Sequence, residues 1–272
     1  RILRQSRVEQ TAQMARRGTR PGGRILLVGG AGAMGRYLQR WFTQAGYQVR
    51  ILDRSDWGAA GALCEGVDLA LLSVPIDHTV EIIRRLAPHL PPDCILGDIT
   101  SLKATPLAAM LAAHPGPVVG LHPLFGPATT TLDKQVVVMT PGRRGADCRW
   151  LLDQFTDWGA IVIEADPREH DAAMAVIQAL RHFAAFTFGK FLYEQDIALD
   201  RTLEFSSPIY RLELGMVGRL FAQDARLYSE IILATPERRA LLRDYLTSLQ
   251  ESLALIEAND KEGFEALFRR IA

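Results

Sequence analysis

The chain has 272 residues, of which 48% are hydrophobic and 23% charged, and this balance predicts two folded domains rather than a disordered or fibrous chain. Its 31 Lys and Arg residues equal its 31 Asp and Glu residues in number, so no excess positive charge favours nucleic acid or an anionic membrane as a partner. The longest apolar run is about half the roughly 20 residues that a transmembrane helix needs, so we expect no membrane span.

Cysteine usage indicates a reducing compartment. Cys64, Cys94 and Cys148 are odd in number, far apart and without paired spacing. We therefore expect reduced thiols in a cytoplasmic protein, with neither a disulfide framework nor a metal site.

The N-terminal segment, residues 1–22, is basic and ends in a Pro/Gly-rich linker. It starts with Arg1 rather than Met and carries six arginines against Glu9 in its first 20 residues. We expect that a further segment precedes it. An Arg-rich, acid-poor start also occurs in organellar transit peptides, which is the alternative interpretation.

From residue 24, short apolar runs alternate with segments of helical period, as in βαβ units. We expect strands at 25–28, 49–52, 69–74, 94–96, 118–119, 136–139 and 161–163. The sequence therefore predicts an α/β fold, with a Rossmann-type doubly wound parallel sheet over residues 23–165.

Strand signals stop at residue 165, and helical period continues to the C-terminus. Residues 166–272 are therefore predicted to form an all-helical domain. The segment 170–192 is apolar on more than one face, so it must be central to its domain or buried between subunits. We expect a homodimer built on this domain.

The first chemical motif is GGAGAMG, directly after the first predicted strand. Gly30, Gly32 and Gly35 have the GxGxxG spacing, which permits a tight turn, close approach to a pyrophosphate and close packing of the next helix. The predicted cofactor loop also includes the residues between these glycines, namely Ala31, Ala33 and Met34.

Two further strand ends complete the predicted cofactor site. Asp53 lies eighteen residues beyond Gly35, where a carboxylate can bond an adenosine ribose and repel a 2′-phosphate, so NAD is favoured over NADP. The neighbouring Arg54 weakens this preference. The third strand ends in a segment expected to line the nicotinamide side, formed by Ser73, Val74 and Pro75.

The second chemical motif is His122, in GLHPLFGP, beside another strand end that carries GDITSLK with Ser101 and Lys103. A histidine near a bound dinucleotide is suited to accept a proton from a carbinol as its hydride leaves. A loop histidine that only caps the backbone is the alternative.

These motifs resemble the prephenate dehydrogenase family. The resemblance runs from residue 24 to the C-terminus through GGAGAMG, SVPI, DITSLK, GLHPLFGP, IQALRHF and SSPIYRLELGMVGRLFAQD. More narrowly, the chain resembles the dehydrogenase half of the bifunctional chorismate mutase/prephenate dehydrogenases of enteric-type bacteria. Residues 1–22 would then be the end of an upstream mutase domain.

The resemblance implies NAD-dependent oxidative decarboxylation of prephenate to 4-hydroxyphenylpyruvate in tyrosine biosynthesis, with no metal. It implies that His122 accepts the proton of the substrate hydroxyl and that Ser101 lies beside that hydroxyl. It also implies that Arg219 binds the ring carboxylate of prephenate, whose plane suits a guanidinium.

The resemblance also implies three further residues of the substrate or cofactor site, whose roles are less defined. Arg211, on the same predicted helix as Arg219, is expected to be a supporting or structural arginine of the substrate site. Lys103 is expected beside the cofactor or the substrate, with a surface or structural ion pair as the alternative. His182 is associated with the substrate side chain and with inhibition by tyrosine.

The sequence is also compatible with three other functions. An arogenate dehydrogenase uses the same ring chemistry on a substrate with an amino acid side chain. A β-hydroxyacid dehydrogenase would need a lysine base, for which Lys190 is the candidate. A non-catalytic dinucleotide-sensing module would need neither the base His122 nor the carboxylate-binding Arg219.

Overall fold

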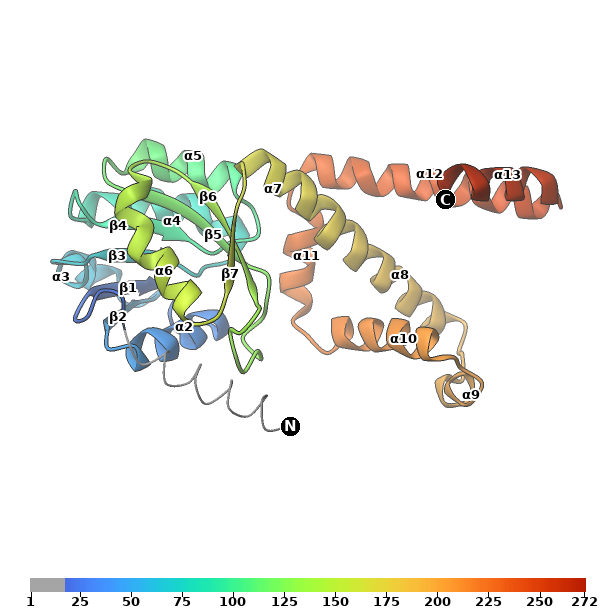
Figure 1. Ribbon diagram of the computed structural model, residues 1–272, viewed down its shortest axis with the longest axis horizontal. Coiled ribbons are helices and arrows are strands. Elements are labelled where there is room, and N and C mark those ends of the chain that lie inside the picture. Colours follow the sequence, from blue (N-terminus) through green and yellow to red (C-terminus); the bar gives the residue numbers. More distant parts are fainter. Residues whose placement is uncertain (1–17) are drawn as a thin grey trace. The chain divides into compact units, whose positions relative to one another are not determined.

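The computed structural model describes residues 18–272, so most of the basic segment predicted at residues 1–22 lies outside the described residues. The chain forms two compact units that divide between Ala172 and Ala173 (Figure 1). No helix in the described range is long and apolar enough to cross a bilayer.

The first unit contains a seven-stranded sheet in the order β2-β1-β3-β4-β5-β6-β7. Its strands are β1 (Arg24–Val28), β2 (Gln48–Leu52), β3 (Leu69–Leu72), β4 (Ile95–Asp98), β5 (Val118–Pro123), β6 (Val136–Pro141) and β7 (Ile161–Glu164). All seven predicted strands are present, and the predicted α/β fold class is confirmed. Strands β1 to β5 are parallel, so their carboxyl ends lie at one edge of the sheet.

The last two strands differ from the expectation of a wholly parallel sheet. Strand β6 pairs antiparallel with β5, and β7 pairs parallel with β6. The connection over residues 124–135 contains no helix, and a parallel partner for β5 would need a crossover connection. A helix does connect β6 to β7, and there the parallel direction returns.

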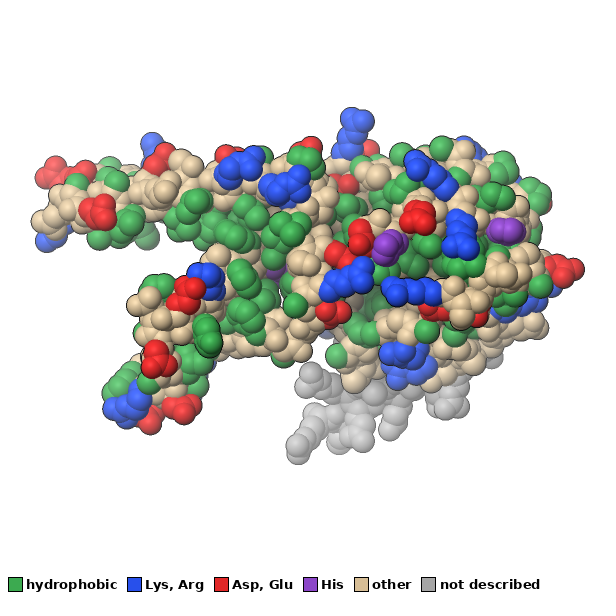
Figure 2. Space-filling model, turned by 180° about the vertical axis from the view of Figure 1, so that it is seen from behind, with side chains coloured by type: hydrophobic (Ala, Val, Ile, Leu, Met, Phe, Trp, Pro, Cys, Tyr) green, Lys and Arg blue, Asp and Glu red, His purple; other side chains and the backbone are tan. Residues whose placement is uncertain are grey.

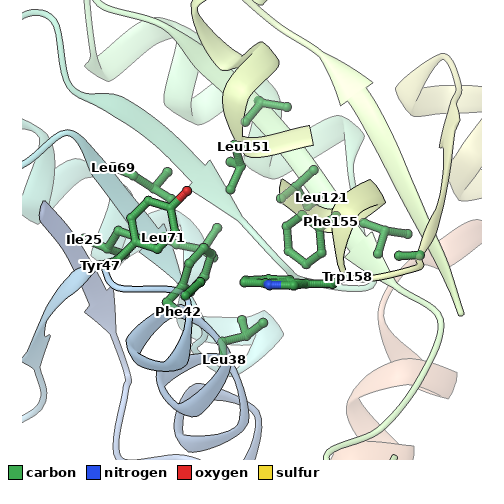
Figure 3. Packing of buried hydrophobic residues seen from close by; sticks show 14 of the residues in the cluster. Ile25, Leu38, Phe42, Tyr47, Leu69, Leu71, Leu121, Leu151, Phe155 and Trp158 are labelled. Atoms are coloured by element: carbon green, nitrogen blue, oxygen red, sulfur yellow. The ribbon is translucent and has the colours of Figure 1, made fainter. Parts of the chain in front are cut away.

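Helices cover both faces of the sheet. They are α2 (Ala33–Gln44), α3 (Ala60–Cys64), α4 (Thr79–Leu86), α5 (Ala104–Ala113) and α6 (Arg149–Asp157), with 3-10 turns at Trp57–Ala59, Ile76–His78, Ala87–His89 and Gly145–Cys148. Alternate residues of β1 belong to opposite cores: Ile25 and Leu27 pack with α2 and α6 (Figure 3), whereas Leu26 and Val28 pack with α3, α4 and α5. Burial on both faces explains why the strand is a continuous apolar run.

The second unit is helical, as predicted. Helix α7 (Pro167–Met174) begins before the division, and a π-helical turn (Ala175–Leu180) joins it to α8 (Arg181–Glu194). The remaining helices are α9 (Leu199–Glu204), α10 (Pro208–Phe221), α11 (Ala225–Leu233), α12 (Pro236–Glu257) and α13 (Lys261–Ile271). Side-chain oxygens cap the first turns of the last four helices, which gives each a defined start.

The helical unit has a small core of its own. Ala185, Val217 and Leu220 form its buried cluster, with Phe188 and Tyr228 packed against it. Many of its large apolar side chains are exposed instead, and Figure 2 shows apolar side chains gathered on these helices. A surface of this kind needs a covering partner, which agrees with the many-sided apolar character of 170–192.

Candidate functional site

The glycine-rich turn joins β1 to α2 at the carboxyl edge of the sheet. Gly29 has φ +77°, and a Cβ there would lie 2.4 Å from the Ser73 carbonyl oxygen. A Cβ on Gly35 would lie 2.6 Å from the Gly30 Cα, so helix and turn can approach only because both positions lack side chains.

The turn has the features that a dinucleotide pyrophosphate requires. Gly32 caps α2 without any side-chain hydrogen bond, and the first turn of the helix carries no acidic residue. The backbone N–H groups of Ala33, Met34 and Gly35 therefore present the positive end of the helix dipole without a competing carboxylate. These residues fit the dinucleotide expected from the sequence.

Asp53 follows β2 directly and lies beside this turn. Its carboxylate accepts a hydrogen bond from the Ala31 N–H at 3.0 Å and one from the Arg54 N–H at 2.9 Å. The Arg54 side chain is exposed. The structure thus brings the predicted ribose-binding carboxylate to the glycine-rich turn, where the ribose next to a pyrophosphate would lie.

The segment after β3 meets the same turn. The Ser73 N–H donates to the Val28 carbonyl at 2.8 Å, and the Ser73 carbonyl faces Gly29. Val74 also approaches Gly29 through its side chain, and Pro75 then leads into a 3-10 turn. All three residues predicted to line the nicotinamide side lie at the edge of the sheet.

Lys103 forms a buried structural ion pair, which was the alternative to a position beside a ligand. Its side chain is fully buried, and its Nζ donates to Asp98 Oδ2 at 2.5 Å and to the Leu121 carbonyl at 2.6 Å. Burial lowers the pKa of Lys103, and the Asp98 carboxylate partly offsets that effect. The ammonium therefore ties the end of β4 to β5, and its contact with a cofactor or substrate stays a prediction.

The loop between β4 and α5 is held by the same carboxylate. Thr100 donates to Asp98 through both its backbone N–H and its hydroxyl. Ser101 is the next residue and is buried, with 8% of its surface exposed. The predicted Ser101 thus lies on a rigid segment at the carboxyl end of β4.

His122 lies within β5, one residue beyond the carbonyl that Lys103 holds. Its ring is buried, and its Nδ1 lies 2.8 Å from Nε2 of His170, a residue of α7. His170 Nδ1 in turn lies 2.9 Å from Asp171 Oδ1. The His122 ring is therefore held by the side chain of a residue in α7.

His170 and Asp171 were not among the functional residues predicted from the sequence. They were included only in an apolar helical segment, because a pattern along one helix does not show which strand that helix faces. A useful signal was present: His170 and Asp171 lie in the first turns of a helix that starts at Asp166-Pro167, and the first turns of that helix lie near the end of the preceding strand.

The predicted substrate residues of the helical unit gather around α8 and α10. The His182 ring packs edge-on against Tyr228 with centroids 4.7 Å apart. Burial, together with the charges of Arg181 and Arg219, lowers the pKa of His182, so its ring is neutral at pH 7. The guanidinium of Arg219 is exposed, and within residues 18–272 it has no hydrogen-bond or salt-bridge partner.

Arg211 is held by neighbouring residues. Its Nε donates to Ser206 Oγ at 2.9 Å, and its Nη2 donates to the Leu203 carbonyl at 3.1 Å. These bonds fasten the start of α10 to the end of α9. The arrangement fits the supporting role that the sequence suggested for this arginine.

No group of three or more His, Cys, Asp or Glu side chains in the described part of the chain is arranged to hold a metal ion. The three cysteines are buried, and burial raises the pKa of Cys94 and of Cys148 to about 12. These thiols are therefore protonated and suit neither nucleophilic attack nor metal binding.

Two family models match the chain. Residues 44–163 match the nucleotide-binding domain of prephenate dehydrogenase, and residues 166–270 match its dimerization domain. The first match begins after the glycine-rich turn, so the interpretation of that turn rests on its own geometry.

Similar proteins carry related descriptions. The "T-protein" of Enterobacter agglomerans is 49% identical over 247 residues, which are 91% of this chain and 66% of that protein. The "4-amino-4-deoxyprephenate dehydrogenase" of Streptomyces pristinaespiralis is 30% identical over 92% of this chain and 90% of its own length. The chain thus spans just under two thirds of the first relative and most of the second.

A solved structure has the same fold. It is the prephenate dehydrogenase from A. aeolicus, in complex with hydroxyphenyl propionate and NAD+. The similarity has a TM-score of 0.68 at 18% identity and covers 92% of this chain and 96% of that one. At this identity the likeness concerns the fold alone.

Replacing Asp53 tests the cofactor site. In the unmutated protein we expect a higher kcat/KM with NAD than with NADP, because the carboxylate repels a 2′-phosphate. Asp53→Ala should reduce this ratio on the order of 10-fold or more, since about 1.4 kcal/mol corresponds to a factor of ten. Arg54→Ala is the matched control and should raise the ratio. Equal kcat/KM values for both cofactors in the unmutated protein would contradict the assignment.

Proposed function

The chain belongs to the prephenate dehydrogenase family, and we propose from this premise that it oxidises prephenate with NAD and releases CO2 to give 4-hydroxyphenylpyruvate. The observation that carries the proposal is His122, a buried imidazole at the same edge of the sheet as the glycine-rich turn. A hydride transfer from a carbinol needs a base at this edge, and histidine is the side chain best suited to that work near neutral pH.

The reaction is proposed to begin at the ring carbon that carries the hydroxyl. NAD, when bound, supplies the hydride acceptor. His122 takes the hydroxyl proton as the hydride leaves, which converts the carbinol to a carbonyl. The electron pair of the bond to the ring carboxylate then moves into the ring, so CO2 departs and an aromatic phenolate forms. The proton held by His122 returns to the phenolate oxygen, and the base is regenerated.

Arg219 is proposed to bind the ring carboxylate of the substrate. Its guanidinium is exposed, and its positive charge contributes to the lowered pKa of His182. A guanidinium binds a carboxylate in one plane, and this would hold the ring in a fixed orientation. Ser101 would assist at the hydroxyl, and Arg211 would support the helix that carries Arg219.

The proposed partners follow from the same family. The match to a dimerization domain and the exposed apolar side chains of the helical unit support a homodimer. We further propose that tyrosine inhibits the enzyme through His182. We also propose that a chorismate mutase domain precedes the dehydrogenase domains in the whole protein, and that the protein works in the cytoplasm.

His122→Asn tests the base directly. The activity is measured as NADH formation with prephenate and arogenate in parallel, and we expect prephenate to give the higher kcat/KM. Asparagine keeps a hydrogen bond but accepts no proton, so kcat should fall roughly 10²- to 10⁴-fold while NAD affinity is retained. A near-normal kcat in the variant would refute the assignment.

The pH dependence of the unmutated protein tests the same role. Its kcat/KM should fall at acidic pH, because a protonated imidazole cannot act as a base.

Arg219→Ala tests the carboxylate anchor. The loss of a charge-assisted pair, of order 2 to 5 kcal/mol, should raise the KM for prephenate far more than it changes NAD affinity. The matched control is Arg201→Ala, which removes another exposed arginine of the helical unit, one that pairs with Glu204 and lies over the Phe205 ring. Equal damage to NAD binding would mean that Arg219 is structural.

The homodimer is testable by sedimentation. We expect a dimer at micromolar concentration, because the helical unit leaves many large apolar side chains exposed. Tyr245→Glu on α12, which places a charge next to Leu249 in the hollow lined by α8, α10 and α12, should shift the protein toward monomer. A stable monomer in the unmutated protein would contradict the proposal.

A further inference from the structure

Three side chains form a hydrogen-bonded chain inside the first unit. His122 Nδ1 lies 2.8 Å from His170 Nε2, and His170 Nδ1 lies 2.9 Å from Asp171 Oδ1. The two rings meet at 75° with centroids 5.0 Å apart, and their exposed fractions are only 4% and 2%. The hydrogen bonds are therefore shielded from water, which strengthens them.

The carboxylate end of this chain has a fixed charge. Asp171 accepts hydrogen bonds from the N–H groups of Lys103 at 2.7 Å and Ala104 at 2.9 Å, at the start of α5. Burial alone would raise the pKa of Asp171, but the bonds from His170, Ala104 and Lys103 outweigh it and hold that pKa below its ordinary value. Asp171 is therefore ionised at neutral pH and can only accept hydrogen bonds.

When both rings are neutral, the negative charge of Asp171 determines which nitrogen of each ring carries the proton. Because Asp171 only accepts, His170 must donate from Nδ1. A neutral His170 with its proton on Nδ1 has an unprotonated Nε2, which accepts. His122 must then donate from Nδ1, so the lone pair of its neutral ring lies on Nε2.

We propose that His170 and Asp171 are positioning residues that hold His122 in the Nδ1-protonated tautomer, so that Nε2 is the atom that takes the substrate hydroxyl proton. The inference rests on the proposed function, in which His122 is the base. When Nε2 takes the proton, the resulting imidazolium still donates from Nδ1 to His170. The charge of Asp171 stabilises that cation through one intervening ring.

The other charged groups near this chain do not cancel that effect. Lys103 and Asp98 face it from the start of α5 and the end of β4, and they neutralise each other in a buried pair. On α7 itself, Arg168 and Glu169 are exposed to solvent. Asp171 is the charged group that is hydrogen-bonded to this chain of rings.

Asp171→Asn should remove the control over the tautomer. Oδ1 of Asp171 accepts from the Lys103 N–H and faces His170 Nδ1, and Oδ2 accepts from the Ala104 N–H, so an amide in either orientation turns its NH2 group toward a backbone donor. The variant has no negative charge to hold the His170 proton on Nδ1 or to stabilise the His122 imidazolium. Both tautomers of His122 then become populated, and kcat should fall on the order of 10²- to 10⁴-fold. The dissociation constant of NAD should stay within about twofold.

The matched control is Asp166→Asn. Asp166 caps the same helix, α7, through the N–H groups of Arg168 and Glu169, and its side chain touches neither histidine. Its kcat should stay within about twofold of the unmutated value, as for an ordinary surface substitution. A loss of kcat equal to that of Asp171→Asn would mean that both carboxylates only support the helix, and would overturn the inference.

A double-mutant cycle separates positioning from helix capping. His170→Phe keeps the ring volume and removes both hydrogen bonds. If Asp171 acts through His170, then Asp171→Asn should cause no further loss of kcat in the His170→Phe background. A full additional loss there would show that Asp171 acts by another route, and would overturn the proposal.

Nitrogen-15 NMR of the histidine rings gives a readout that does not depend on activity. We expect His122 to be protonated on Nδ1 in the unmutated protein and to populate both tautomers in Asp171→Asn. A His122 protonated on Nε2 in the unmutated protein, or an unchanged tautomer in the variant, would overturn the inference. Failure of the proposed function is distinguishable, because it would appear as no NADH formed from prephenate by the unmutated protein, whatever the tautomer.

Discussion

The carboxyl edge of the sheet depends on the buried ion pair between Lys103 and Asp98. An ammonium that loses all contact with water carries a desolvation cost of several kcal/mol, so it is tolerated only where a carboxylate and further acceptors surround it. Asp98 and the Leu121 carbonyl supply those acceptors. The pair therefore fixes the backbone beside His122 on one side and the loop that leads into α5 on the other. The backbone N–H groups that bind Asp171 lie at the end of that loop.

Much of the first unit could be predicted because its signals are local. A strand buried on both faces must be a continuous apolar run, and a turn that meets a pyrophosphate must lack side chains at defined spacings. The direction of β6 could not be predicted from its own residues, since it depends on whether residues 124–135 form a crossover helix. The antiparallel pairing follows from the absence of such a helix in that described segment.

The site was only partly predictable for a related reason. A sequence motif identifies which side chains reach an edge of the sheet, and so Ser101 and His122 were placed there. It does not show whether a lysine turns toward a ligand or inward, and Lys103 turns inward to a carboxylate five residues earlier in the chain. Nor does it show which helix supplies the second partner of a histidine. His170 and Asp171 are 48 and 68 residues from the groups that they bind, so only the folded chain brings them together.

The demands of the proposed reaction explain why a histidine with a distant carboxylate suits this edge better than a carboxylate alone. The substrate proton is held only between hydride transfer and formation of the phenolate, so the base must accept and release it with little cost. A carboxylate in direct contact would repel the two carboxylates of the substrate and would be too weak a base near neutral pH. A neutral imidazole avoids that repulsion before the transfer. After it, the negative charge of Asp171, separated from His122 by the His170 ring, stabilises the imidazolium without meeting the substrate.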